Sequence, residues 1–550
     1  MSKIVQSFQA LKANQSSVVL TGSKLTVSQI LAVARNDTPI EFTQNKKITQ
    51  KIAKTHEKML EQISNGVPIY GCNTGYGERA SVVVNSGSKK ERLASARAIS
   101  EGIVHVDVSV GPRFEKDVVR AAMLIRINML MPGLSAVKLG DLDIYRKILN
   151  AQITPVVNQY GGIGASGDLA HNGRVLSVAR QLPGAKVINE SGKEVDAATA
   201  LQAAEISKLI LDPKAGLGFV NGDNFSTAVA VLLATDTQQA LLLSLVLSAM
   251  TIEVLGGTNR SFHSLLSTYR SHQGQVEAAE ILRSLLDGSS LAKQEMTGHQ
   301  PRKPGEKVQD AYSLRCLPQF QAINIEAVEK AMDVIGVNAN SVSDNPLWVT
   351  DQDAADNEDA WQWVSGGNFL AMHMAESLDS LRKVMTRITK LSDRHLFRLV
   401  SPIHNNGLPA NLSDSQAITQ SSFKGVQIQS GMFDVYSSLL SQPVNTMFGS
   451  HEENNQDITS HALTSGILGL ENIRITRYAL AQQMLALFQA VELKKAGHLL
   501  SPKTTLLYDF LKEEVEYVSK ERPLHHDIER LYQSISVGKI DSILHKIFSD

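Results

Sequence analysis

The sequence predicts a mainly α-helical protein built around a bundle of long helices. An apolar pattern runs from 225 to 254 without a single glycine or proline. Roughly thirty helical residues would span about 45 Å, and helices of that length are typical of a bundle whose core runs the length of the protein. Further long helical patterns occur at 323–336, 368–391, 415–440 and 461–493. Strand patterns are short by comparison, which excludes a large sheet.

The N-terminal elements are predicted from local signals. Residues 18–20 read as a short strand, and Thr26 with Gln29 forms a capping-box pattern that opens a helix. Further helices are expected at 47–64 and 91–100, and another opens at Gly111–Pro112 and ends at 131–133. A helix should run from 169 toward 182, followed by a hairpin over 187–195.

We expect three regions along the chain. Residues 1–215 form a smaller N-terminal part, 216–500 the central long-helix bundle, and 501–550 a helical tail with charges outside. Between the bundle helices, 287–309 is a long charged loop, and loops of that length are usually functional or disordered.

Composition narrows the functional class. The 550 residues are 43% hydrophobic and 20% charged, and the formal net charge is −1. A surface for nucleic acid or anionic membrane needs a basic excess, so neither partner is expected. The two cysteines form no disulfide framework, and no ligand cluster has zinc spacing, so no metal is expected. The most apolar run, 240–250, is too short to cross a bilayer, and the first 17 residues lack a signal-peptide core. We therefore expect a cytoplasmic protein.

One glycine-rich stretch, 161–170, carries unusual chemistry. It contains Ala165, Ser166 and Gly167. The Gly167 amide nitrogen can attack the Ala165 carbonyl carbon if the backbone bends tightly, and glycine reaches such geometries. Loss of water closes a five-membered ring, and loss of the Ser166 hydroxyl as a second water gives 4-methylideneimidazole-5-one (MIO). This electrophile needs no external cofactor. Serine and aspartate are also ordinary turn residues, so the motif alone leaves a plain turn open.

Six segments occur in a fixed order along the chain, and together they decide between these readings. With them the sequence resembles the aromatic amino acid ammonia-lyase and aminomutase family, which includes the histidine, tyrosine and phenylalanine ammonia-lyases. The resemblance runs from about residue 20 to beyond 493. The segments are 70–77, 164–169, 220–222, 309–315, 343–346 with 366–369, and 452–457.

The resemblance implies a fold and a set of roles. The fold is the long-helix bundle of the ammonia-lyase type, similar to fumarase and aspartase, with a smaller MIO-bearing N-terminal part. The family is typically homotetrameric, with sites built from several subunits. Tyr70 would take the β-proton, Asn221 would hydrogen-bond the ring carbonyl, Arg315 would grip the substrate carboxylate and Glu452 would lie near the amine. The other matched positions line the pocket or support the electrophile: Gln309, Tyr312, Asn345, Phe369, Asn455 and Gln456.

The sequence departs from the family pattern in two places that bear on function. After Ser-Gly-Asp-Leu-Ala the family usually continues with Pro-Leu, a small residue and His or Tyr, whereas residues 171–174 read His-Asn-Gly-Arg. The pair expected to recognise the substrate ring is Ala98–Ile99, where relatives commonly carry Ser-His, His-Leu or Phe-Leu. An apolar pair offers no partner to a phenol or imidazole, which favours an uncharged ring over histidine.

The sequence therefore predicts a carbon–nitrogen lyase that removes ammonia from an aromatic L-α-amino acid to give an arylacrylate. A phenylalanine- or tyrosine-like substrate is favoured. Three alternatives stay open at this point: a histidine ammonia-lyase, a 2,3-aminomutase on the same substrates, and a family member without catalytic activity.

Overall fold

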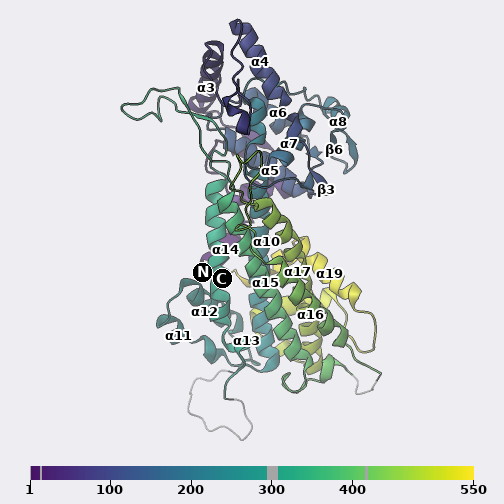
Figure 1. The fold of residues 1–550 in the computed structure, drawn as a ribbon. Helices are drawn as coiled ribbons and strands as arrows, with labels where there is room; N and C mark the ends of the chain where they lie inside the picture. Colours follow the sequence, from purple (N-terminus) through teal and green to yellow (C-terminus); the bar gives the residue numbers. More distant parts are fainter. Residues whose placement is uncertain (1, 13–14, 294–307, 415–418, 550) are drawn as a thin grey trace.

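The computed structural model describes residues 2–12, 15–293, 308–414 and 419–549. Two regions are visible in the ribbon: a smaller N-terminal part above and a bundle of long helices below (Figure 1). The loop predicted at 287–309 lies mostly outside the described residues. The division at residues 215 and 500 stays a prediction.

Five long helices form the bundle, as the sequence predicts. In the middle, α10 packs against α15 and α17, while α14 and α16 pack on the outer sides of α15. Their bounds are α10 Asn224–Leu255, α14 Leu317–Asn338, α15 Met372–Val400, α16 Lys424–Leu440 and α17 Ala462–Lys494. The long patterns in the sequence thus correspond to real helices, although α14 starts earlier and α15 and α16 start later than expected.

The central helix α10 is buried almost all round. Of its 32 residues only Asp236 is not fully buried, so its apolar side chains pack against neighbours on every side. By length and composition the segment Ala215–Leu255 could cross a membrane, yet in the structure all of its most apolar stretch is buried. A helix that is hydrophobic all round is the core helix of a large bundle.

The N-terminal part contains shorter helices and small sheets. Thr26 caps its helix with the predicted capping box, and the 187–195 hairpin is present. The helices are α2 Val27–Arg35, α3 Lys46–Ser64, α4 Lys89–Gly102, α5 Lys116–Leu130, α6 Leu139–Asn150, α7 Leu169–Ala179, α8 Ala197–Ala203 and α9 Ala215–Val220. The strands are β1 Val18–Leu20, β2 Ile40–Phe42, β3 Val110–Arg113, β4 Thr154–Pro155, β5 Asn158–Tyr160, β6 Lys186–Ile188 and β7 Glu194–Asp196.

One N-terminal expectation is wrong. Gly111–Pro112 does not open a helix: both residues lie in β3, which pairs antiparallel with β5. Gly111 has φ +85°, a conformation foreign to a helix, and α5 begins only at Lys116.

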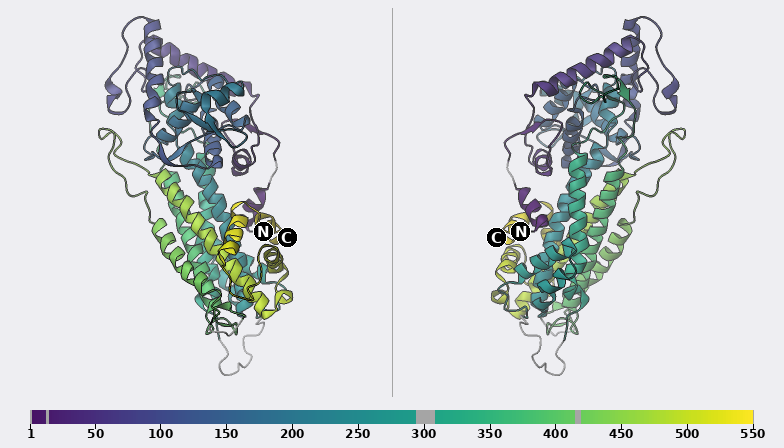
Figure 2. Two further views of the ribbon diagram at one scale, coloured as in Figure 1. Left: turned by 90° about the vertical axis from the view of Figure 1, so that its right-hand side faces the viewer. Right: turned by 90° about the vertical axis from the view of Figure 1, so that its left-hand side faces the viewer.

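The remaining elements lie along the sides of the bundle. The chain termini lie close together beside it, where α1 and the C-terminal helices meet (Figure 2). These elements are α1 Lys3–Ala10, α11 Ser264–Thr268, α12 Gln273–Leu286, α13 Tyr312–Arg315, α18 Pro502–Glu514, α19 His525–Ser536, α20 Asp541–Ile547, β8 Leu347–Trp348 and β9 Trp363–Val364. The tail after residue 501 is helical, as predicted.

Candidate active site

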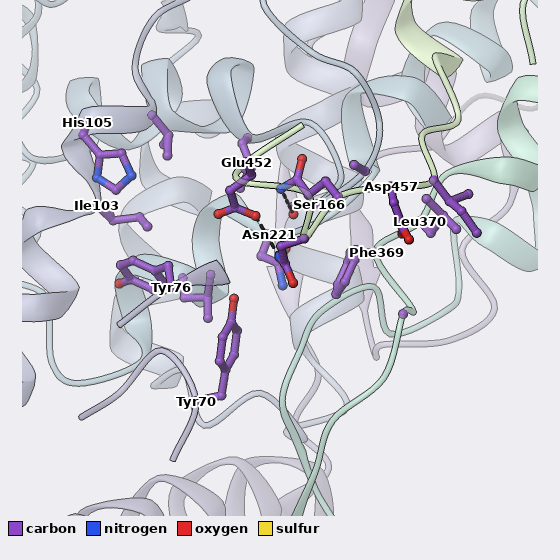
Figure 3. Close-up of a pocket in the computed structure, with 18 residues that line it drawn as sticks. Tyr70, Tyr76, Ile103, His105, Ser166, Asn221, Phe369, Leu370, Glu452 and Asp457 are labelled. Atoms are coloured by element: carbon purple, nitrogen blue, oxygen red, sulfur yellow. Dashed lines mark hydrogen bonds between the residues drawn. The ribbon is translucent and has the colours of Figure 1, made fainter. Parts of the chain in front are cut away.

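A cavity of about 250 Å³ lies beside Ser166, where several loops converge (Figure 3). Side chains from the 70–77 loop, the start of α7, α9 and the segments 367–370 and 452–458 line it. Five of the six sequence segments therefore meet at one place, and only 309–315 is absent from the lining. The predicted residues among its lining are Tyr70, Ala165, Ser166, Asn221, Phe369, Glu452, Asn455 and Gln456.

The Ala165–Ser166–Gly167 segment bends at a position that only glycine can occupy. Gly167 has φ +70°, and a Cβ there would collide with the Gly222 backbone, so only glycine fits. The Asp168 amide donates to Gly222 O at 2.9 Å, which holds the segment against the turn before α10. These residues fit the formation of MIO.

Asn221 lies where it can serve the ring carbonyl. In one orientation its Nδ2 donates to Asp344 Oδ1 and Asn345 O across 3.3 and 3.4 Å. With the amide oxygen and nitrogen exchanged, Nδ2 donates to Ser166 O at 3.1 Å and Oδ1 accepts from the Asn345 amide at 3.2 Å. We assign the second orientation because both bonds are shorter. Ser166 O is the atom that becomes the carbonyl of the ring.

Asp168 is fully buried beside the segment. Its carboxylate accepts from the Ser226 amide and hydroxyl, both at 2.7 Å. Burial nevertheless raises the pKa of Asp168 to about 7, because desolvation outweighs these hydrogen bonds. A carboxyl group with that pKa can both give and take a proton near neutral pH.

Tyr70 faces Glu452 across the cavity (Figure 3). The Gly77 amide donates to the Tyr70 hydroxyl at 3.1 Å, and a Cβ on Gly77 would collide with the Glu452 carboxylate. Burial, and to a lesser extent the charge of Glu452, raise the pKa of Tyr70. Within this chain the surroundings of Tyr70 thus favour the protonated phenol over the phenolate, and a nearby cation would act in the opposite direction.

The loop 452–457 contributes polar groups around Ser166. Gln456 Nε2 donates to Ser166 Oγ at 2.9 Å, and Asn455 Nδ2 donates to Glu452 Oε2 at 2.9 Å. Glu452, Glu453 and Asn454 all have positive φ. Three consecutive residues in this conformation are uncommon and are held only where surrounding contacts require them.

Asn345 acts from behind the cavity and does not line it. It is buried, and its Oδ1 accepts from Ser365 Oγ at 3.0 Å and from the Gly366 amide at 2.8 Å. Asn345 thus holds the segment that carries Phe369 into the cavity. The Ser365 hydroxyl makes one of these bonds.

Gln309, Tyr312 and Arg315 do not reach the cavity of their own chain. They lie on and beside α13, near the lower end of the bundle, whereas α7 and the cavity lie at the upper end (Figure 1). Tyr312 is 74% exposed, and the Arg315 guanidinium lies 4.6 Å from its ring. The family resemblance predicts that these residues share a site with Ser166, but within one chain the fold separates them from it.

The ring-recognition pair is also displaced. Ala98 is exposed and neither it nor Ile99 lines the cavity; Ile99 contributes only a carbonyl that accepts from the Tyr76 hydroxyl at 3.2 Å. The α4 helix continues to Gly102, and the helical turn that follows it, Ile103–Val106, contributes the cavity lining instead. The lining residues that were not among the predicted site residues fall into two groups. Outside the matched segments lie Ile103, His105, Val106, Leu217, Leu370 and Ile458, and inside them lie Tyr76, Leu169, Gly367 and Asp457. Only the apolar character of most of them could have suggested them.

The departure at residues 171–174 is accommodated inside the fold. His171 is buried, its Nε2 lies 3.0 Å from Gln159 O, and burial lowers the pKa of His171 to about 4. Gly173 lies against the backbone of Asp107, and Arg174 pairs with the Asp107 carboxylate at 2.7 Å. None of these side chains lines the cavity.

Comparison with known proteins identifies the family of the chain. The sequence model of the family described as aromatic amino acid lyase matches residues 25–513. A phenylalanine ammonia-lyase from Nostoc punctiforme is 32% identical over 93% of this chain and 90% of its own length. A histidine ammonia-lyase from Alkaliphilus oremlandii is 30% identical over 96% and 98%. The crystal structure of a tyrosine aminomutase from Streptomyces globisporus superposes with a TM-score of 0.87 at 25% identity, covering 96% of this chain and 98% of that one.

The long-helix bundle and the serine loop at its end define a carbon–nitrogen lyase. More narrowly, the chain belongs to the aromatic amino acid lyase family. The chain is about equally similar to a phenylalanine and a histidine ammonia-lyase, at 32% and 30% identity. The substrate must therefore be argued from the residues that line the cavity.

Proposed function

We propose that this chain eliminates ammonia from an aromatic L-α-amino acid, phenylalanine- or tyrosine-like, to give an arylacrylate, using MIO formed from Ala165, Ser166 and Gly167. The observation that carries the proposal is the position of Ser166 in the cavity, with Asn221 Nδ2 3.1 Å from its carbonyl oxygen and Tyr70 on the opposite wall. When formed, the ring supplies the carbon electrophile that side chains lack.

The residues of the chain take separate tasks in this proposal. Tyr70 removes the β-proton of the substrate, and Asn221 stabilises negative charge on the Ser166 carbonyl oxygen. Glu452 lies across the cavity from Tyr70, where it handles the proton of the departing amine. Phe369 and the apolar lining exclude water from the substrate ring.

A carboxylate-binding cation is missing from this cavity. Among the described residues, neither arginine nor lysine lines it. Arg315 is the matched residue, and its Nε is buried without a hydrogen-bond partner in the described part of the chain. We therefore propose a homotetramer in which Gln309, Tyr312 and Arg315 of one subunit complete the cavity of another. A cation there would also lower the pKa of Tyr70 toward the range a base needs.

An exposed apolar stripe supports association of copies. On α16 four large side chains recur at helical spacing and are 54–67% exposed: Ile428, Met432, Val435 and Leu439. A stripe of this kind usually marks a protein interface.

The two cysteines are both free, which fits the reducing cytoplasm that we propose as the location.

The apolar cavity wall favours an uncharged substrate ring. Leu169, Leu217 and Ile103 would surround the ring, and a phenyl group needs no polar partner there. The polar side chains on that side are His105, whose Nδ1 already lies 3.0 Å from Gly102 O, and Tyr76, whose hydroxyl already donates to Ile99 O at 3.2 Å. This arrangement supports phenylalanine-like over histidine substrates.

Product analysis with L-phenylalanine, L-tyrosine and L-histidine tests the proposal. We expect free ammonia and the matching arylacrylate, and an intact mass two water molecules below that encoded. A β-amino acid product would identify an aminomutase instead, and urocanate as the main product a histidine ammonia-lyase. The full encoded mass without turnover would identify a non-catalytic family member.

A further inference from the structure

Asn172 stands in the first turn of α7, where the family usually has leucine. It is only 3% exposed, so its polar side chain is surrounded by protein. A buried carboxamide in place of an aliphatic side chain is costly unless it forms hydrogen bonds. Its contacts therefore show what it does in this chain.

The Asn172 carboxamide grips the turn that presents Asn221. Its Nδ2 lies 3.1 Å from Val220 O and 3.0 Å from Gly222 O, the two carbonyls that flank Asn221, and also donates to Asn224 Oδ1, so its two hydrogens are shared among three acceptors. Asn221 itself has φ −89° and ψ 63°, and the Gly222 amide donates to Val220 O at 3.1 Å. These values describe an inverse γ-turn with Asn221 at its centre.

The grip is anchored in the core. Asn172 and Asn224 form a reciprocal amide pair in which each Nδ2 lies 2.8 Å from the Oδ1 of the other. Asn224 Nδ2 also donates to Ala122 O of α5 at 3.0 Å. The turn is thus fastened on one side to α7, which begins just after the Ser166 segment, and on the other to the central helices.

Satisfying buried carbonyls is not the reason for these bonds. Val220 O already accepts from the Gly222 amide, and Gly222 O already accepts from the Asp168 amide at 2.9 Å. The bonds from Asn172 are additional, and their effect is to restrict the turn. Since Asn221 Nδ2 must stay 3.1 Å from Ser166 O, a rotation of the turn would break that contact.

We propose that Asn172 is a positioning residue that fixes the γ-turn at Asn221 and thereby keeps the Asn221 amide on the Ser166 carbonyl oxygen. The inference rests on the proposed function. It assigns to this chain a polar support for its ring-carbonyl donor, placed where the family usually has an aliphatic side chain.

The test compares the full-length protein with Asn172→Leu, Asn172→Asp, Asn221→Ala and the Asn172→Leu/Asn221→Ala double variant. Asn128→Asp is the matched control, because Asn128 is equally buried and donates to Ala339 O, away from the turn. Intact mass, the ultraviolet absorption band of the MIO ring and kcat with L-phenylalanine are measured. The band reports hydrogen bonding to the ring carbonyl, so a change in folding stability alone would leave it in place.

We expect Asn172→Leu to shift the band in the same direction as Asn221→Ala and to lower kcat about tenfold, less than the roughly 10²–10³ that loss of a whole oxyanion donor costs. In the Asn221→Ala background the Asn172 change should add nothing further. Asn172→Asp places an oxygen against two carbonyls, so it should shift the band in the same direction and lower kcat. It serves as the test variant if Asn172→Leu is insoluble. A band unchanged by both Asn172 variants, or a multiplicative loss in the double variant, overturns the inference. Failure of the proposed function can be distinguished from failure of this inference, because the unmutated protein would then have the full encoded mass.

Discussion

Gln456 donates a hydrogen bond to the hydroxyl of Ser166 across 2.9 Å, although the two residues lie 290 positions apart in the chain. The loop between α16 and α17 is thereby tied to the loop that opens α7. In the proposed maturation the Ser166 hydroxyl is the group that leaves, so its surroundings bear directly on that chemistry.

Ser166→Ala should stop maturation after the first dehydration. The ring can still close between Ala165 and Gly167, but no hydroxyl is left to lose. Intact mass should be lower than encoded by one water molecule, against two in the unmutated protein, and turnover should fall by at least about 10³-fold, because the electrophile is absent. Turnover at the unmutated rate would contradict a role for this serine.

Tyr70→Phe and Arg315→Ala should complement one another. Each variant alone should lose most activity, because it lacks either the proposed base or the proposed carboxylate-binding cation. The two should complement because Tyr70 lies in the cavity, whereas Arg315 lies near the other end of its own chain and would serve the cavity of another subunit. Mixed tetramers made by co-expression contain some sites with both native residues, so activity should return to a substantial fraction of the native level. Tyr70→Phe mixed with Glu452→Gln is the matched control, because both residues line the same cavity of one chain. Equal recovery in the control would exclude shared sites.

Glu452→Gln should move the pH dependence of the reaction. Tyr70 acts as a base only when ionised, and the negative charge of Glu452 raises the pKa of Tyr70. Removing that charge lowers the pKa, so the rising limb of kcat/KM against pH should shift to lower pH even though the rate itself falls. A limb that does not move would mean that Tyr70 is not the group being titrated.

Asp168→Asn should change how stability depends on pH. The pKa of Asp168 is about 7 in the folded protein and near the ordinary aspartate value of 3.8 in the unfolded chain. The folded state therefore binds the proton more tightly, and this contribution to the free energy of unfolding is fully present below about pH 4 and lost as pH rises through about 7. The contribution amounts to at most ~4 kcal/mol. His171, whose pKa is lowered to about 4, acts in the opposite direction.

Denaturation of both proteins at pH 4.5 to 7.5 measures this effect as a difference, which cancels the histidine contributions. The unmutated protein should lose stability relative to Asp168→Asn as pH rises. A constant difference across that range would show that Asp168 keeps an ordinary pKa.

Substrate preference should follow the apolar wall. Phenylalanine should exceed histidine in kcat/KM by about 5–150-fold, the equivalent of about 1–3 kcal/mol for a polar ring buried without a partner, with tyrosine between them. Because Ala98 does not line the cavity, Ala98→His should leave the ratio of tyrosine to phenylalanine within about twofold, whereas Leu217→Asn should lower phenylalanine selectively. A strong response to Ala98→His would place that residue against the ring after all.

Much of the fold is encoded in local patterns. The 225–254 run specified α10 because a helix surrounded by protein on every side must be apolar on every side. Thr26 fixed the start of its helix through its own side chain. By contrast, Gly111–Pro112 resembled a helix start, and pairing of β3 with β5 overrode that local signal.

The sequence by itself determined the bundle, the family and the Ala165–Ser166–Gly167 motif on which the proposed chemistry rests, because these depend on periodicity and on motifs that are contiguous in the chain. Tertiary structure decided which segments meet. It brought Gln456 to Ser166 and set Arg315 at the other end of the bundle, and it placed His105 where Ala98 was expected. It also showed that Asn172 holds the Asn221 turn. Spacing along a chain fixes distances only within one element, whereas distances between loops depend on how the helices that carry them pack.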